Sequence, residues 1–124
     1  MILKTKIKLN VFDAFVIFEI TDNVHKRYEH IKKRANETAD EDDGATYLGL
    51  HFRSGGNEHI LIDTKYVNYN VVSHEIFHAG KSMTTGRGVN DEETMALTIG
   101  CISKHIFTFL AKNNYNLIDG TKSK

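Results

Sequence analysis

One segment, residues 71–80, constrains this chain more than any other, because its spacing requires a helix. It places His74 and His78 four residues apart, with Glu75 directly after the first histidine. Residues four apart lie one turn above each other on the same face of an α-helix. An apolar stripe recurs at the same helical spacing: Val72, Ile76, Ala79 and Met83. The pattern predicts a helix over residues 69–83 that buries one face and holds both histidines on another.

The two histidines and Glu75 form a His-Glu-x-x-His sequence, a spacing suited to binding a metal ion. On a helix, the two imidazole rings converge on one point and can both ligate zinc at about 2.0–2.1 Å. Glu75 lies beside the metal rather than among its ligands, where it can accept a proton from water. We interpret His74 and His78 as metal ligands and Glu75 as a general base. The alternative is a pair of surface histidines on an ordinary amphipathic helix.

A catalytic zinc site usually has three protein ligands, so a further ligand must come from another segment. The last predicted helix, over residues 91–113, begins with two candidates, Glu92 and Glu93. At 100° per residue, Glu93 shares a helical face with the small residues Ala96 and Gly100. Small residues would permit a close approach to the histidine helix, so we favour Glu93 over Glu92.

Glu93 also has a purely structural interpretation. Asn90 precedes it by three residues, which is the spacing of a capping box, and acidic residues are favoured in the first turn of a helix. Because two histidines lie upstream, we favour the ligand role for Glu93.

Other side chains that could contribute chemistry are assigned weaker roles. His105 and Cys101 fall on the polar face of the last helix, which is typical of surface positions rather than ligands. His51 and His59 lie in a predicted hairpin, where either could stabilise an oxyanion, although a solvent-facing histidine is the more common outcome. Arg87, in the glycine-containing loop after the histidine helix, is a further weak oxyanion candidate.

The N-terminal half predicts a small sheet with one helix inserted in it. The expected elements are strands over 2–9 and 15–20, a helix over 22–36, an acidic loop over 36–44, and strands over 45–53 and 58–64. Thr21 or Asp22 can cap the helix, whose basic run is typical of a solvated face. The turn formers at 54–57 predict a hairpin. We therefore expect a single α+β domain over 1–124, in the order β-β-α-β-β followed by two helices.

Composition limits the partners that can be expected. Lys and Arg together number 16, as do Asp and Glu, so no broad field attracts nucleic acid or an anionic membrane. The single cysteine, Cys101, excludes an internal disulfide and favours a reducing compartment. The N-terminus has no secretory pattern, and no apolar run approaches the ~20 residues that span a bilayer. We expect a cytoplasmic protein with neither a nucleic-acid nor a membrane partner.

At these residues the chain resembles the gluzincin-type zinc metallopeptidases, in which a His-Glu-x-x-His helix precedes a helix that carries a glutamate ligand. It looks closest to the small metallopeptidases of phages and prophages, at the matching positions His74, Glu75, His78, Glu93 and Ala96. The resemblance implies a minimal zincin-like domain, a Zn²⁺ cofactor, a peptide or protein substrate and, for a phage protein, the host cytoplasm. Larger gluzincins carry an aspartate four residues after the glutamate ligand, whereas this chain has Leu97.

Two alternatives to a metallopeptidase remain. The chain could be a non-catalytic zinc-binding module that contacts a phage or host protein, with all four metal positions filled by protein. Peptide deformylase also uses His-Glu-x-x-His. It requires a cysteine ligand upstream of that motif, however, and Cys101 lies downstream.

Overall fold

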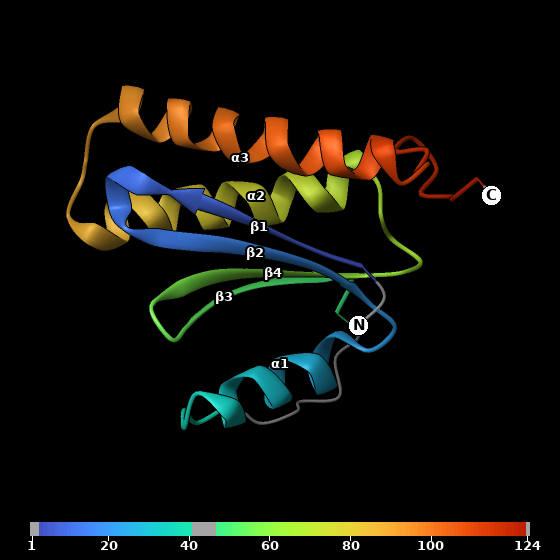
Figure 1. Cartoon of the computed structure of the whole chain (residues 1–124), viewed down its shortest axis with the longest axis horizontal. Helices are drawn as coiled ribbons and strands as arrows, with labels where there is room; N and C mark the ends of the chain where they lie inside the picture. Colours follow the sequence, from blue (N-terminus) through green and yellow to red (C-terminus); the bar gives the residue numbers. More distant parts are fainter. Residues whose placement is uncertain (1–2, 41–46, 124) are drawn as a thin grey trace.

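The computed structural model describes residues 3–40 and 47–123, which form four strands and three α-helices (Figure 1). The strands are β1 (Leu3–Leu9), β2 (Ala14–Thr21), β3 (Gly49–Ser54) and β4 (Asn57–Asp63). The helices are α1 (Val24–Arg34), α2 (Tyr69–Thr84) and α3 (Glu92–Lys112), with short 3-10 turns at Asn10–Phe12 and Thr85–Arg87. The predicted α+β class and the predicted order of elements are confirmed.

The four strands form one mixed sheet in the order β1-β2-β4-β3. The outer pairs, β1 with β2 and β3 with β4, are antiparallel, whereas the central strands β2 and β4 are parallel. The β3–β4 hairpin turns at Gly55 and Gly56, which have φ values of 59° and 81°. Positive φ at both central residues is the geometry of a type I′ turn, which explains why glycines occupy this position.

Helices α2 and α3 cover one face of the sheet, and α1 covers the other (Figure 1). Strand β2 directs Val16, Phe18 and Ile20 toward α2 and α3, where all three are fully buried. The apolar stripe predicted for the histidine helix is buried as expected, through Val72, Ile76, Ala79 and Met83. This stripe fixes the rotation of α2, and thereby leaves the histidines on its outer face.

On the opposite face, a smaller cluster joins α1 to the sheet through Val24, Tyr28, Phe52 and Leu61. Glu19 of β2 is also buried there, and Arg27 of α1 donates to its two carboxylate oxygens at 2.6 and 3.0 Å. This bidentate pair lets a carboxylate lie under a helix without an unpaired buried charge.

Several local details differ from the predictions. Helix α1 is capped by Asn23, whose side chain accepts from the Lys26 backbone N–H at 3.0 Å, rather than by Thr21 or Asp22. Strand β3 begins at Gly49; residues 41–46, including most of the predicted acidic residues and the start of the predicted strand, lie outside the described part.

The C-terminal tail packs back onto the domain. Leu117 is buried in the main core, and its carbonyl accepts a hydrogen bond from the backbone N–H of Tyr69 at 2.8 Å. The tail therefore helps to fix the first turn of the histidine helix.

Helix α3 is, within the described residues, the one helix whose length and apolar content would suffice to cross a membrane. Its Ile102, Ile106 and Leu110 are fully buried in the main core. Core packing accounts for only part of the apolar character of this helix, because 22% of its apolar segment is buried and Leu97 is 66% exposed.

Candidate metal centre

Helix α2 brings the two histidines of the motif together on its exposed side. Asn68 caps the helix by accepting from the backbone N–H of Val71, and His74 and His78 then fall one turn apart. Their Nε2 atoms lie 3.1 Å from each other. Two zinc–nitrogen bonds at a tetrahedral angle would hold such atoms about 3.3 Å apart. The predicted convergence of the two rings is confirmed, and their separation is compatible with a shared metal ion; ligation of a metal stays a prediction.

Glu75 lies next to the histidines but is turned inward, against strand β3. Only 7% of its surface is exposed, and a Cβ atom added at Gly49 would lie 3.1 Å from its Cγ. Burial raises the pKa of Glu75, although the nearby His74 and His78 and a hydrogen bond from the His51 backbone N–H oppose this effect. A carboxyl group with a raised pKa is a better proton acceptor near neutral pH.

A cleft opens beside Glu75, between the beginning of β3 and the first half of α2. Its volume is about 330 Å³. Residues 47–49 line one side, and Asn70, Val71, His74 and Glu75 line the other. An extended ligand in this cleft would therefore lie beside both Glu75 and His74.

Glu93, the predicted third ligand, lies on an exposed face of α3. Asp91 caps this helix through the Thr94 backbone N–H, so Glu92 and Glu93 occupy its first turn and are both exposed. Within residues 3–40 and 47–123, no group of three His, Cys, Asp or Glu side chains comes close enough together to hold a metal. Ligation by Glu93 stays a prediction.

The close contact between α2 and α3 uses a different face from the one predicted. Ala96 and Gly100 are exposed, and nothing lies within 4 Å of a Cβ built at Gly100. The contact instead places Ile99 on Gly80, where an added Cβ would be 2.4 Å from the Ile99 side chain. Burying the isoleucines of α3 removes more apolar surface from water than burying its alanine and glycine, so the small residues turn outward.

The two hairpin histidines have separate environments, and neither is the solvent-facing residue that was expected. His51 is partly buried beside the metal centre, where its ring stacks near that of His78 with centroids 6.4 Å apart. His59 is buried on the opposite face of the sheet and stacks on Phe52. Of the two, His51 is therefore the one that can act at the centre.

A buried carboxylate, Glu58, holds His51 in place. Glu58 has no exposed surface, and its Oε1 lies 2.6 Å from the His51 Nε2. Arg53 and Arg87 contact its other oxygen at 3.2 and 3.1 Å. Glu58 was not among the predicted site residues, although its alternation with Ile60 and Ile62 along one strand placed it on the core face.

Arg87, a weak oxyanion candidate in the sequence, is engaged in this network instead. Besides Glu58, its guanidinium donates to the backbone carbonyls of Ser82 and Gly56, each at 3.4 Å. These contacts join the end of α2 to the β3–β4 hairpin, which is a structural role.

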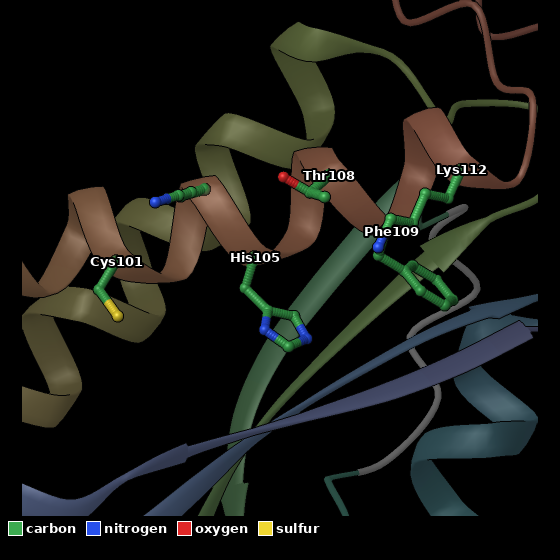
Figure 2. A pocket seen from close by; sticks show the side chains of 6 residues that line it. Cys101, His105, Thr108, Phe109 and Lys112 are labelled. Atoms are coloured by element: carbon green, nitrogen blue, oxygen red, sulfur yellow. The ribbon is translucent and has the colours of Figure 1, made fainter.

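His105 and Cys101 lie away from the metal centre, as predicted. Figure 2 shows their side chains on the side of α3 nearer the strands, beside a cavity of about 430 Å³. The His105 Nε2 lies 3.1 Å from the Thr5 hydroxyl of β1, the strand at the opposite edge of the sheet from β3. This cavity is separate from the cleft at Glu75.

No protein-family model, no curated protein and no solved structure matches this chain. The geometry of the residues themselves is therefore the basis for inferring a function.

Proposed function

We propose that this chain is a zinc-dependent hydrolase, acting on peptides as a minimal zincin-like metallopeptidase. The observation that carries the proposal is the 3.1 Å approach of the two Nε2 atoms of His74 and His78 beside the buried Glu75. Two converging imidazoles are a common part of a zinc site, and an adjacent carboxylate is the usual partner for activating water.

Each residue of the centre has a distinct task in this proposal. A bound zinc ion supplies a Lewis acid that makes water more acidic and polarises a carbonyl group. His74 and His78 hold the ion, and Glu93 is the proposed third ligand. Glu75 takes the proton from the attacking water and delivers it to the leaving amine. Since Glu93 is exposed at the start of α3, its ligation requires that the first turn of α3 moves when zinc binds.

His51 is the group best placed to stabilise the oxygen of the substrate. Besides His74 and His78, His51 is the histidine that interacts with Glu75. Glu58 fixes one of the two ring nitrogens of His51. A histidine held in this way is preorganised, which is the requirement for stabilising a developing oxyanion.

An extended peptide is the substrate class that the surroundings favour. Strand β3 is an edge strand of the sheet, and the cleft at Glu75 begins at its first residues. Peptides often bind by adding a strand to such an edge, where backbone hydrogen bonds accumulate along the peptide. We therefore expect kcat/KM to rise with peptide length until β3 is fully paired; equal cleavage of short and long peptides would contradict strand addition.

The decisive experiment compares the zinc content and peptidase activity of purified variants. We expect about one zinc per chain in the wild type, retained in Glu75→Gln but weakened in His74→Ala, His78→Ala and Glu93→Gln. Glu75→Gln should lower kcat by roughly 10²–10⁴-fold. Glu92→Gln is the matched control for Glu93→Gln, and His105→Ala is the control for the histidine variants.

Different outcomes separate the proposal from its alternatives. Zinc that depends on His74 and His78 without any peptide hydrolysis would favour a non-catalytic zinc-binding module. Loss of zinc in Glu92→Gln alone would transfer the third-ligand role to Glu92. A wild-type protein that binds no zinc would remove the proposal.

A further inference from the structure

The charges of this neutral chain are not evenly distributed over its surface. Strand β1 alternates Lys4, Lys6 and Lys8 with apolar residues and a threonine, and all three lysines are exposed. Ile7 of the same strand is buried in the main core, so the lysines point to the opposite face of the sheet, the face that carries α1. Lys8 is paired with Asp13 at 2.8 Å, but Lys4 and Lys6 have no carboxylate of β1 beside them, so formal neutrality of the chain conceals a line of cations along this edge.

Helix α1 adds further positive charge to the same face. A small cavity of about 160 Å³ lies between α1 and the sheet, lined by Lys4 together with Arg27, His30 and Arg34 of the helix. The one carboxylate that lines it, Glu19, is buried and paired with Arg27, with Lys4 at 3.8 Å. The negative charge inside the cavity is thus neutralised, and the cations around its mouth remain.

One residue that lines the cavity carries a buried polar atom without a hydrogen-bond partner. His59 lines the cavity and is 7% exposed, and its Nδ1 has no hydrogen-bond partner among the described residues. An unpaired buried polar atom costs free energy, and a ligand or a water molecule that reached it would recover that cost.

An aromatic side chain lies within the row of lysines. Phe15 of β2 is only partly buried, and it pairs directly with Lys8 across the two strands. The ammonium groups of Lys6 and Lys8 lie 5.7 and 4.9 Å from the centre of its ring. Because these ammonium groups lie over the ring, a flat group stacks on Phe15 by displacing one of them or by using the part of the ring that they leave exposed.

We propose that this basic face, formed by Lys4, Lys6, Lys8, Phe15, Arg27, His30 and Arg34, binds single-stranded nucleic acid. Alternate residues of a strand are about 6.7 Å apart, a scale that suits the successive phosphates of an extended single strand. A positively charged track beside an aromatic stacking surface is the usual means of binding single strands without sequence preference. The cavity at Arg34 receives one phosphate group, and Phe15 stacks on a base.

The basic face lies on the opposite side of the sheet from α2 and its histidines, so this inference is independent of the metal centre (Figure 1). Binding should not require zinc, and Glu75→Gln should leave it unchanged.

The test measures fluorescence anisotropy of a labelled oligothymidylate of about 12 nucleotides at several salt concentrations. The triple variant Lys4→Gln/Lys6→Gln/Arg34→Gln should weaken binding more than tenfold at low salt. It should also reduce the slope of log K against log salt concentration by about 2, at roughly 0.7 for each lost charge. Phe15→Leu should weaken binding about tenfold without changing the slope, because stacking is not ionic.

The matched control is the triple variant Lys81→Gln/Lys104→Gln/Lys112→Gln, which removes the same charge from exposed positions on α2 and α3. We expect less than a twofold effect from this control. Equal weakening by the two triple variants would overturn the inference, and so would the absence of binding at low salt. Binding to phosphatidylserine vesicles but not to the oligonucleotide would overturn it in favour of a membrane surface.

Discussion

His51 illustrates how one side chain acquires a defined position from its neighbours. On an edge strand, a histidine would ordinarily sample several rotamers, but the Glu58 carboxylate lies 2.6 Å from its Nε2 and is itself fully buried. The contacts of Arg53 and Arg87 with Glu58 keep that carboxylate ionised and oriented. His51 is therefore held close to His78 without belonging to the His-Glu-x-x-His motif.

The His51→Ala substitution tests this arrangement. If His51 stabilises the substrate oxygen, its loss should lower kcat by roughly 10- to 1000-fold while zinc content stays at the wild-type level. Steady-state kinetics and metal analysis on the same preparation give both values. His105→Ala is the control, because His105 is exposed on α3 and bonded to Thr5. Equal activity of His51→Ala and the wild type would exclude a role for His51 in the reaction.

The close contact between α2 and α3 requires glycine at position 80, because any side chain there would meet α3. At Gly80 the two helices approach so closely that a Cβ atom would overlap the Ile99 side chain. This contact sets the rotation of α3 about its own axis. With Ile99, Ile102 and Ile106 facing inward, the face that carries Glu93 must point to solvent.

Alanine at Gly80 should therefore destabilise the protein by about 1–3 kcal/mol through overpacking, although alanine favours a helix. Alanine at Gly100 is the matched control; open space surrounds that position, so it should stabilise by about 0.5–1 kcal/mol. Urea unfolding of both variants measures the difference. Adding Ile99→Ala to Gly80→Ala should recover part of the lost stability. Stabilisation by Gly80→Ala alone would show that the helices are not in close contact.

Among the described residues, the two carboxylates with almost no exposed surface, Glu58 and Glu19, lie on opposite faces of the sheet. Burial alone would raise the pKa of Glu58, but hydrogen bonds from His51, Ser82 and Arg87 outweigh it, and the pKa is lower than usual. For Glu19 the same opposition between burial and Arg27 also ends in a lowered pKa. Glu58 joins the β3–β4 hairpin to Arg87 after α2, and Glu19 joins β2 to its neighbours α1 and β1, so the ionisation of each affects the stability of the fold.

A carboxyl group with a lower pKa in the folded state stabilises the fold above its unfolded pKa, and this contribution is lost as the pH falls. Glu58→Gln should reduce the free energy of unfolding by about 1–3 kcal/mol at pH 7. The difference from the wild type should shrink as the pH falls below about 4.5. Urea unfolding between pH 7 and 3 measures it. The control is Asp13→Asn, which removes an exposed surface pair with Lys8 and should leave the dependence of stability on pH nearly unchanged. A difference for Glu58→Gln that does not vary with pH would contradict ionic pairing of Glu58.

Much of the local structure follows from the sequence because helix and strand periodicity are short-range properties. The apolar stripe of α2, the lysine alternation of β1 and the glycine turn of the hairpin predicted their elements within a few residues. The convergence of His74 and His78 was predictable for the same reason, since one helical turn fixes it.

Only the tertiary structure decided which faces meet. Contacts between distant segments determine three features: the inward burial of the α3 isoleucines, the position of Glu58 between hairpin and helix, and the separation of His51 from His59. The tertiary structure also decided how charge is distributed over the surface. The formal charges of the sequence sum to zero, but that sum does not say where each charge lies. Packing gathers Lys4, Lys6 and Lys8 with the cations of α1 on one face, because the apolar residues that alternate with them are drawn to the core on the other.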